Sequence, residues 1–137
     1  MKNSDVFNAW IHLTKYHDRI LKAIDYRLHD RFQMGTKEFY LLYYLEQSEQ
    51  GKMSLSGLVP KVGLSHSALS RLVTRLEKHK DGPYIKRQTN MKDKRSVAIV
   101  LMKKGEMLVS EMQTLIDESL QTQLVEKDII HIKRLIQ

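Results

Sequence analysis

Apolar residues recur at helical spacing at both ends of the chain. Over residues 3–31 the repeating positions are Val6, Trp10, Leu13, Ile20, Ile24 and Leu28. Spacings of three, four and seven residues place side chains on one face of a helix, so the pattern predicts one long amphipathic helix there. The same periodicity returns from Gly105 to about Gln121 and from Glu126 to Gln137. We therefore expect two further helices at the C-terminal end.

Shorter elements are expected between these helices. Gly35 ends the first helix, and Thr36 is a candidate cap for a second helix that runs to about residue 46. Ser54 is expected to open a third helix over 55–61, followed by a tight turn at 62–64 and a fourth helix over 65–79.

The pattern then changes from helical to extended. A turn at 81–83 precedes two predicted strands, over 84–87 and 96–101, which flank a basic loop. The expected fold is mainly α with a two-stranded β hairpin. Because 137 residues suit one hydrophobic core, we expect a single domain over 1–137. Within it, 36–102 forms a lobe of short elements, flanked by the helices of 3–31 and 105–137.

The fourth helix has one apolar and one polar side. Two short helices joined by a turn that contains Gly are typical of a helix-turn-helix, whose second helix enters the major groove of DNA. Hydroxyls and cations suit phosphates and base edges. The candidate DNA-binding residues of this helix are Ser65, His66, Ser67, Ser70, Arg71, Thr74, Arg75 and Lys78, opposite the apolar Leu69, Leu72, Val73 and Leu76.

Positive charge is concentrated in the same part of the chain. The net charge is +7, and residues 52–104 hold 13 Lys and Arg against 3 Asp and Glu. The hairpin loop adds Lys92, Asp93, Lys94 and Arg95, where long cations could reach the minor groove or its phosphates and the carboxylate could orient Arg95. A polyanion-binding face is favoured over an ordinary solvated basic surface.

Several segments together resemble the MarR-type winged helix-turn-helix regulators. They are Leu55-Ser56-Gly57-Leu58, Val62-Gly63-Leu64-Ser65, Ser70-Arg71-Leu72-Val73, Arg75-Leu76-Glu77, Asp93-Lys94-Arg95-Ser96 and Lys104-Gly105. Three places depart from the usual pattern: Pro60 should shorten the third helix, 80–83 is a long connection, and Met102 replaces a capping Thr.

The resemblance implies a function and partners. It implies a homodimer that binds double-stranded DNA at a pseudo-palindromic operator, as a repressor in most cases, and the surplus of apolar residues in the flanking helices supports a dimer. It also implies a small amphipathic or phenolic effector. Trp10, His17, Tyr40, Tyr43 and Tyr44 are candidates to line its site, although aromatic residues at helical spacing equally suit a core.

Other classes of function lack sequence support. No phosphate-binding loop, nucleophile elbow or carboxylate pair indicates an enzyme, and no cofactor is expected. The absence of Cys excludes thiol chemistry, and the spacing of the six His favours no metal site. With no leader or apolar span, we expect a cytoplasmic protein. The alternative that stays open is a winged helix that binds an acidic protein partner.

Overall fold

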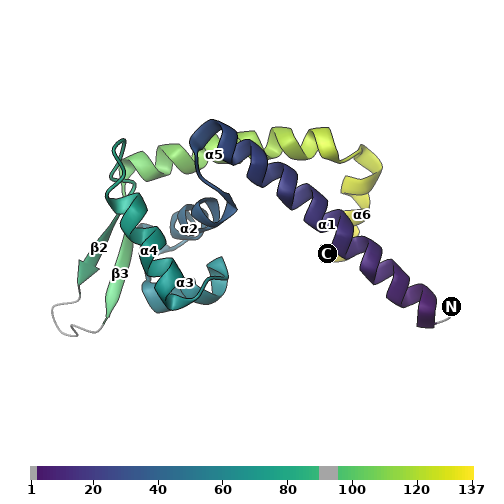
Figure 1. Ribbon diagram of the computed structural model, residues 1–137, viewed down its shortest axis with the longest axis horizontal. Coiled ribbons are helices and arrows are strands. Elements are labelled where there is room, and N and C mark those ends of the chain that lie inside the picture. The colour runs from purple at the N-terminus through teal and green to yellow at the C-terminus, as the bar shows by residue number, and fades with distance from the viewer. Residues whose placement is uncertain (1–2, 90–95) are drawn as a thin grey trace. The chain divides into compact units, whose positions relative to one another are not determined.

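The computed structural model describes residues 3–89 and 96–137 (Figure 1). In chain order the elements are α1 (Asn3–Phe32), α2 (Thr36–Glu46), a short 3-10 helix η1 (Glu49–Gly51), β1 (Lys52–Ser54), α3 (Leu55–Val62), α4 (His66–Glu77), β2 (Ile85–Thr89), β3 (Val97–Leu101), α5 (Lys103–Gln123) and α6 (Glu126–Ile136). The mainly α fold class with a β hairpin is confirmed. The chain divides into two compact units, Met34–Gln113 and Met1–Gln33 with Thr114–Gln137, and the division falls within α5.

The unit Met34–Gln113 contains the helix-turn-helix and the hairpin. In Figure 1, α4 lies between α3 and the hairpin, and it packs against α3 on one side and β2 on the other. Apolar side chains from all these elements are removed from water, which is the main stabilising contribution to such a core. Those at most 2% exposed include Leu41, Leu42, Leu45, Leu58, Val62, Leu69, Leu72, Val73, Leu76, Ile85 and Ile99.

The hairpin belongs to a three-stranded antiparallel sheet of order β1-β3-β2. Thr89 pairs with Val97 at the loop end of the hairpin, and Ile85 pairs with Leu101 at its base. The strand β1, which the sequence pattern did not predict, pairs Lys52 with Val100 along the other edge of β3. The sheet therefore extends the hairpin on its β3 side, and β2 remains an edge strand.

The cap of α3 agrees with expectation, and the cap of α2 differs from it. Ser54 caps α3 as predicted, because its Oγ accepts a hydrogen bond of 3.0 Å from the N–H of Gly57. Thr36 was expected to cap α2, but the N-cap residue is Gly35, whose N–H donates to Glu38 Oε2 at 2.8 Å. A Glu three residues into a helix can reach back in this way to the cap backbone.

The expected shortening of α3 at Pro60 is wrong. The helix continues to Val62 and ends at Gly63, which has a φ of 77°. The N–H of Gly63 donates to Val59 O at 3.0 Å, and the Lys37 ammonium donates to the carbonyls of Val62 and Gly63 at 3.0 and 3.4 Å. Carbonyl groups left free at a helix end are thus bonded, which offsets the hydrogen bond that proline removes.

The helix α4 ends at Glu77, two residues before the predicted end at His79. The connection over 80–83 turns back on the helix, since the N–H of Gly82 donates to His79 O at 2.9 Å and that of Tyr84 to Leu76 O at 3.2 Å. Its Gly82–Pro83 peptide bond is cis. The long connection therefore brings β2 directly back to the end of α4.

The second unit is formed by α1, the later part of α5 and α6. Leu28, Leu115 and Ser119 are buried, and the Tyr16 hydroxyl joins α1 to α6 through a 3.1 Å hydrogen bond to Asp128 Oδ2. Many large apolar side chains on α1 and around α6 remain exposed: Val6, Phe7, Trp10, Leu13, Val125, Ile130, Ile132, Leu135 and Ile136. In the part of the chain that the structure describes, no helix is long and apolar enough to cross a membrane.

Candidate nucleic-acid interface

The two sides of α4 differ in exposure as the sequence pattern predicts. Its apolar side is at most 2% exposed. On the other side, Ser70 and Thr74 are half-buried. The remaining candidate residues there are exposed: Ser65, His66, Ser67, Arg71, Arg75 and Lys78. Ser65 also caps the helix, because its Oγ accepts a 3.2 Å hydrogen bond from the N–H of Ala68. The structure thus brings all the α4 candidates onto one short helix, and their contact with DNA stays a prediction.

The cations of this surface are largely free to meet an anion. Arg75 lies 3.9 Å from Glu38, but its side chain is 70% exposed, and an ion pair in that setting contributes little. An Arg can donate two hydrogen bonds to one guanine or phosphate. Exposed Arg71 and Arg75, flanked by small hydroxyl groups, are therefore suited to close contact with the edges and backbone of a duplex.

Both half-buried hydroxyls already have protein partners. Thr74 Oγ1 donates to Ser70 O at 3.1 Å, one turn earlier in the helix. Ser70 Oγ accepts a 3.0 Å hydrogen bond from Nη2 of Arg87 in β2. Ser70 and Thr74 therefore lie at the border between the exposed face of α4 and the sheet, with geometry set by the protein.

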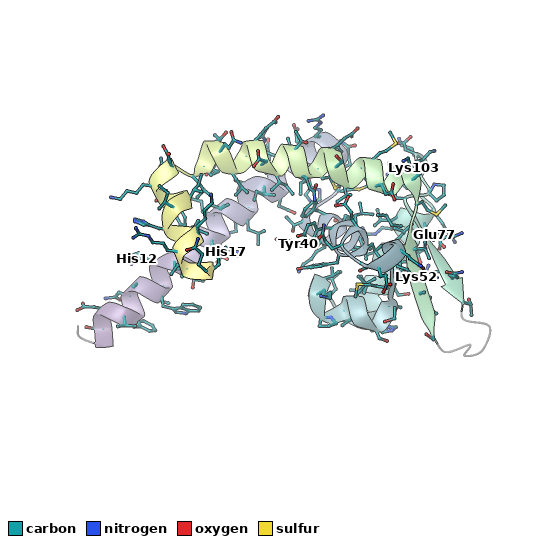
Figure 2. All side chains as sticks on the ribbon, turned by 180° about the vertical axis from the view of Figure 1, so that it is seen from behind. His12, His17, Tyr40, Lys52, Glu77 and Lys103 are labelled. Atoms are coloured by element: carbon teal, nitrogen blue, oxygen red, sulfur yellow. The ribbon has the colours of Figure 1, made fainter. Side chains whose placement is uncertain are left out.

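Arg87 and Glu77 form a link between hairpin and helix that sequence reasoning missed. Arg87 Nη1 lies 3.1 Å from Glu77 Oε1, and the Arg87 N–H donates to Glu77 Oε2 at 2.9 Å. Figure 2 shows Glu77 at the end of α4 beside the strands. The sequence did contain one indication of this link. Side chains alternate between the two faces of a strand, and Arg87 follows buried Ile85 by two residues, so both point to the inward face.

The four candidates of the hairpin loop, Lys92, Asp93, Lys94 and Arg95, lie outside the described residues. The strands on either side of them are described, and the last described pair is Thr89 with Val97. The structure thus pairs the two strand residues that flank this segment, and β2, which carries one of them, packs on α4. The roles of the four residues stay predictions from the sequence.

The candidate ligand residues fall into two groups. Trp10 and His17 are exposed on α1, whereas Tyr40, Tyr43 and Tyr44 are half-buried on α2 in the other unit (Figure 2 labels His17 and Tyr40). The tyrosines pack on each other, with ring centroids 6.2 Å apart for Tyr40 and Tyr44 and 5.3 Å apart for Tyr43 and Tyr44. Burial raises the pKa of Tyr40 above its ordinary value. The tyrosine cluster is thus a half-buried aromatic surface on α2.

The histidines provide no metal centre among the described residues. No group of three or more His, Cys, Asp or Glu side chains there could hold a metal ion. His29 Nε2 lies 3.5 Å from Asp25 Oδ2, and both side chains are largely exposed. The pair at this helical spacing is a surface contact on α1.

Comparisons with known proteins agree with this geometry. The family model described as MarR family matches residues 37–97. No curated protein matches the chain at the level of sequence. Among solved structures, the chain is similar to AbsC, a MarR family transcriptional regulator from Streptomyces coelicolor, with a TM-score of 0.79 at 19% identity, over 100% of this chain and 92% of that one.

Two further similar structures concern DNA binding. Sco3205, a MarR family transcriptional regulator from Streptomyces coelicolor in complex with DNA, has a TM-score of 0.77 at 17% identity, over 99% of this chain and 86% of that one. Bordetella bronchiseptica BpsR, whose DNA binding is regulated by 6-hydroxynicotinic acid, has a TM-score of 0.70 at 21% identity, over 90% and 86%. Residues 37–97 are therefore a MarR family domain, and the chain has the winged helix-turn-helix fold of MarR-type transcriptional regulators.

Proposed function

We propose that this chain is a sequence-specific regulator of transcription that binds double-stranded DNA with α4 in the major groove. The observation that carries the proposal is the exposed side of α4, where hydroxyls and cations stand opposite a fully buried apolar side. Short hydroxyl side chains allow close approach, and Arg71 and Arg75 can donate to bases or phosphates. The MarR family domain over 37–97 includes this whole helix and supports the same assignment.

The hairpin loop is the second proposed contact. Lys92, Lys94 and Arg95 supply three cations within four residues, and the excess positive charge of 52–104 surrounds them in sequence. Phosphate contacts of this kind supply affinity and make it strongly dependent on salt. We expect Arg95 to enter the minor groove next to the major groove that α4 occupies.

The active species in this proposal is a homodimer. Large apolar side chains of α1 and α6 are exposed in the single protomer, among them Trp10 at 63%, Leu135 at 74% and Ile136 at 79%. Apolar surface of this extent on a protein is typical of an interface. A two-fold dimer would bind two half-sites about 34 Å apart, and hence a pseudo-palindromic operator. Occupancy of a promoter by this dimer would repress transcription in the cytoplasm.

A small effector would release the dimer from DNA. The packed aromatic rings of the α2 tyrosines suit a phenolic or amphipathic molecule, and the ligand named for BpsR is a small aromatic acid. An effector of this kind acts by favouring the arrangement in which the two recognition helices no longer match the half-sites. Thermal-shift screening of aromatic acids against the protein, with and without operator, tests this part of the proposal.

Fluorescence anisotropy tests the central proposal. Duplexes selected from a random library, and scrambled versions of them, are titrated with the protein over a salt series. We expect tight binding to the selected sequence, a steep decrease in affinity with salt, and two protomers per site. Equal, weak binding to both duplexes would contradict sequence-specific recognition and would favour a winged helix that binds an acidic protein.

A further inference from the structure

The cluster around Arg87 joins three groups at the border of the proposed DNA-binding face. Its guanidinium donates to Glu77 Oε1 at 3.1 Å, to Ser70 O at 2.8 Å and to Ser70 Oγ at 3.0 Å. The side chains of Arg87 and Glu77 are only 29% and 27% exposed. A planar guanidinium that bonds several fixed acceptors is held in one orientation, so the cluster is a rigid connection between β2 and α4.

The backbone of β2 takes part in the same connection. The strand lies at one edge of the described sheet, and the N–H of Arg87 donates to Glu77 Oε2 at 2.9 Å. The N–H groups that point outward from an edge strand have no strand partner, and here a carboxylate of α4 accepts from one of them. A single Glu therefore binds both the backbone and the side chain of one β2 residue, which fixes the strand relative to the helix.

The cluster also sets the charge beside the DNA-binding face. Glu77 is the only acidic residue of α4. A free carboxylate there would repel phosphates, and a partly buried charge is screened less by salt than an exposed one. Because Arg87 pairs with it, the end of the helix carries no unpaired negative charge.

The hydrogen bond to Ser70 has a further consequence. A hydroxyl has one hydrogen and two lone pairs, so an oxygen that accepts from Arg87 keeps its own hydrogen for another partner. Phosphate oxygens and most major-groove base edges are acceptors. We infer that Arg87 is a positioning residue for DNA recognition: it locks β2 onto α4 and orients Ser70 as a hydrogen-bond donor. The inference rests on the proposed DNA-binding function.

The lock between β2 and α4 is tested without DNA. Arg87→Met removes one charge and three side-chain hydrogen bonds, whereas Lys86→Met removes one charge from the exposed neighbour on the same strand. Amide hydrogen exchange is measured for both variants and the wild type. We expect amide exchange over 85–89 to be about tenfold faster in Arg87→Met and unchanged in Lys86→Met. Hydrogen bonds to a charged group stabilise the closed state of a segment enough to slow its local opening by about that factor. Equal exchange in all three proteins would overturn the lock.

Recognition is tested with the operator and its scrambled duplex. Arg87→Met should lose about tenfold in affinity for the operator and much less for the scrambled duplex, whereas Lys86→Met should weaken both equally. Arg87→Lys should recover only part of the loss, since an ammonium lacks the planar fork. In a Ser70→Ala background the loss caused by Arg87→Met should be smaller.

The outcomes separate the inference from the function on which it rests. If the wild type does not distinguish the duplexes, the proposed function fails, while the exchange experiment still decides the lock. Suppose instead that the wild type is selective, and that Arg87→Met lowers the affinity for both duplexes by the same factor, as Lys86→Met does. Arg87 then acts through its charge alone, and the positioning role is wrong. Should Arg87→Met not fold, Arg87→Lys and Ser70→Ala provide the same comparison of the two duplexes.

Discussion

Gly105 lies where no other residue fits. A Cβ at this position would meet the carbonyl oxygen of Tyr84 and come within 2.6 Å of Leu101 Cδ1. Because the first of these is a backbone atom at the start of the hairpin, it cannot move aside without displacing β2. The Lys104-Gly105 pair of the family resemblance thus has a packing explanation: it lets the start of α5 approach the hairpin closely.

We expect Gly105→Ala to lower the free energy of unfolding by about 1–3 kcal/mol, the usual cost of overpacking. Chemical denaturation followed by circular dichroism measures it. Met107→Ala is the control, because Met107 is 59% exposed in the same helix and should change stability by less than about 0.5 kcal/mol. Unchanged stability in Gly105→Ala would show that the close approach to Tyr84 does not exist.

Arg95 and Lys92 should differ in how they affect binding. Arg95→Ala should weaken operator binding by about 1–3 kcal/mol, whereas Lys92→Ala should mainly reduce the salt dependence, as loss of a phosphate contact does. Anisotropy titrations at several salt concentrations separate the two effects. Wild-type affinity in Arg95→Ala would argue against a minor-groove contact by the hairpin loop.

The residues of the exposed α4 face could be predicted from sequence, because helical periodicity alone assigns each position to a side. Arg87 and Glu77 could not, since ten residues and a turn separate them and their contact depends on how β2 packs against α4. Alternation along β2 placed Arg87 on the inward face, but nothing local indicated which acceptors it would find there.

At the scale of elements, Lys37 connects α2 to the turn of the helix-turn-helix. Its ammonium donates to the last carbonyl of α3 and to Gly63, which starts the turn. We expect Lys37→Met to lower the free energy of unfolding by about 0.5–1 kcal/mol, a modest value because the Lys is exposed. Thermal unfolding measures the change, with Lys80→Met as a control that removes one charge elsewhere. An equal effect of both substitutions would assign the change to net charge.

Most elements could be predicted because their ends carry local signals: Ser54 and Ser65 are caps, and Gly63 adopts the positive φ that a helix end favours. The strand β1 carried no such signal. Its three residues, Lys-Met-Ser, are not a strand pattern, and they form one only because β3 offers an open edge. The shortening of α3 predicted from Pro60 was wrong because of another contact that is distant in sequence. Lys37 of α2 donates a hydrogen bond to the carbonyl of Val62 at the end of α3.

At the scale of the whole molecule, the exposed apolar residues of α6 test the proposed dimer. Leu135→Glu should raise the dissociation constant of the dimer by about tenfold or more, since a carboxylate would enter an apolar interface. Lys133→Glu is the matched control, because it places the same carboxylate about 200° around the helix. Sedimentation velocity over a range of concentrations measures both. A monomeric wild type, or a dimer that Leu135→Glu leaves intact, would contradict the proposal.

The order of strands in the sheet has a consequence for synthesis of the protein. Both β1 and β2 pair only with β3 among the described strands, and β3 follows the helix-turn-helix in the chain. While the protein leaves the ribosome, α3 and α4 therefore emerge before β3, the strand that pairs with both β1 and β2. The side of α4 that carries Ser70 and Glu77 has no completed sheet beside it until residues 97–101 have been made. Competence to bind an operator should thus arise late in translation, when β3 enters between its two neighbours.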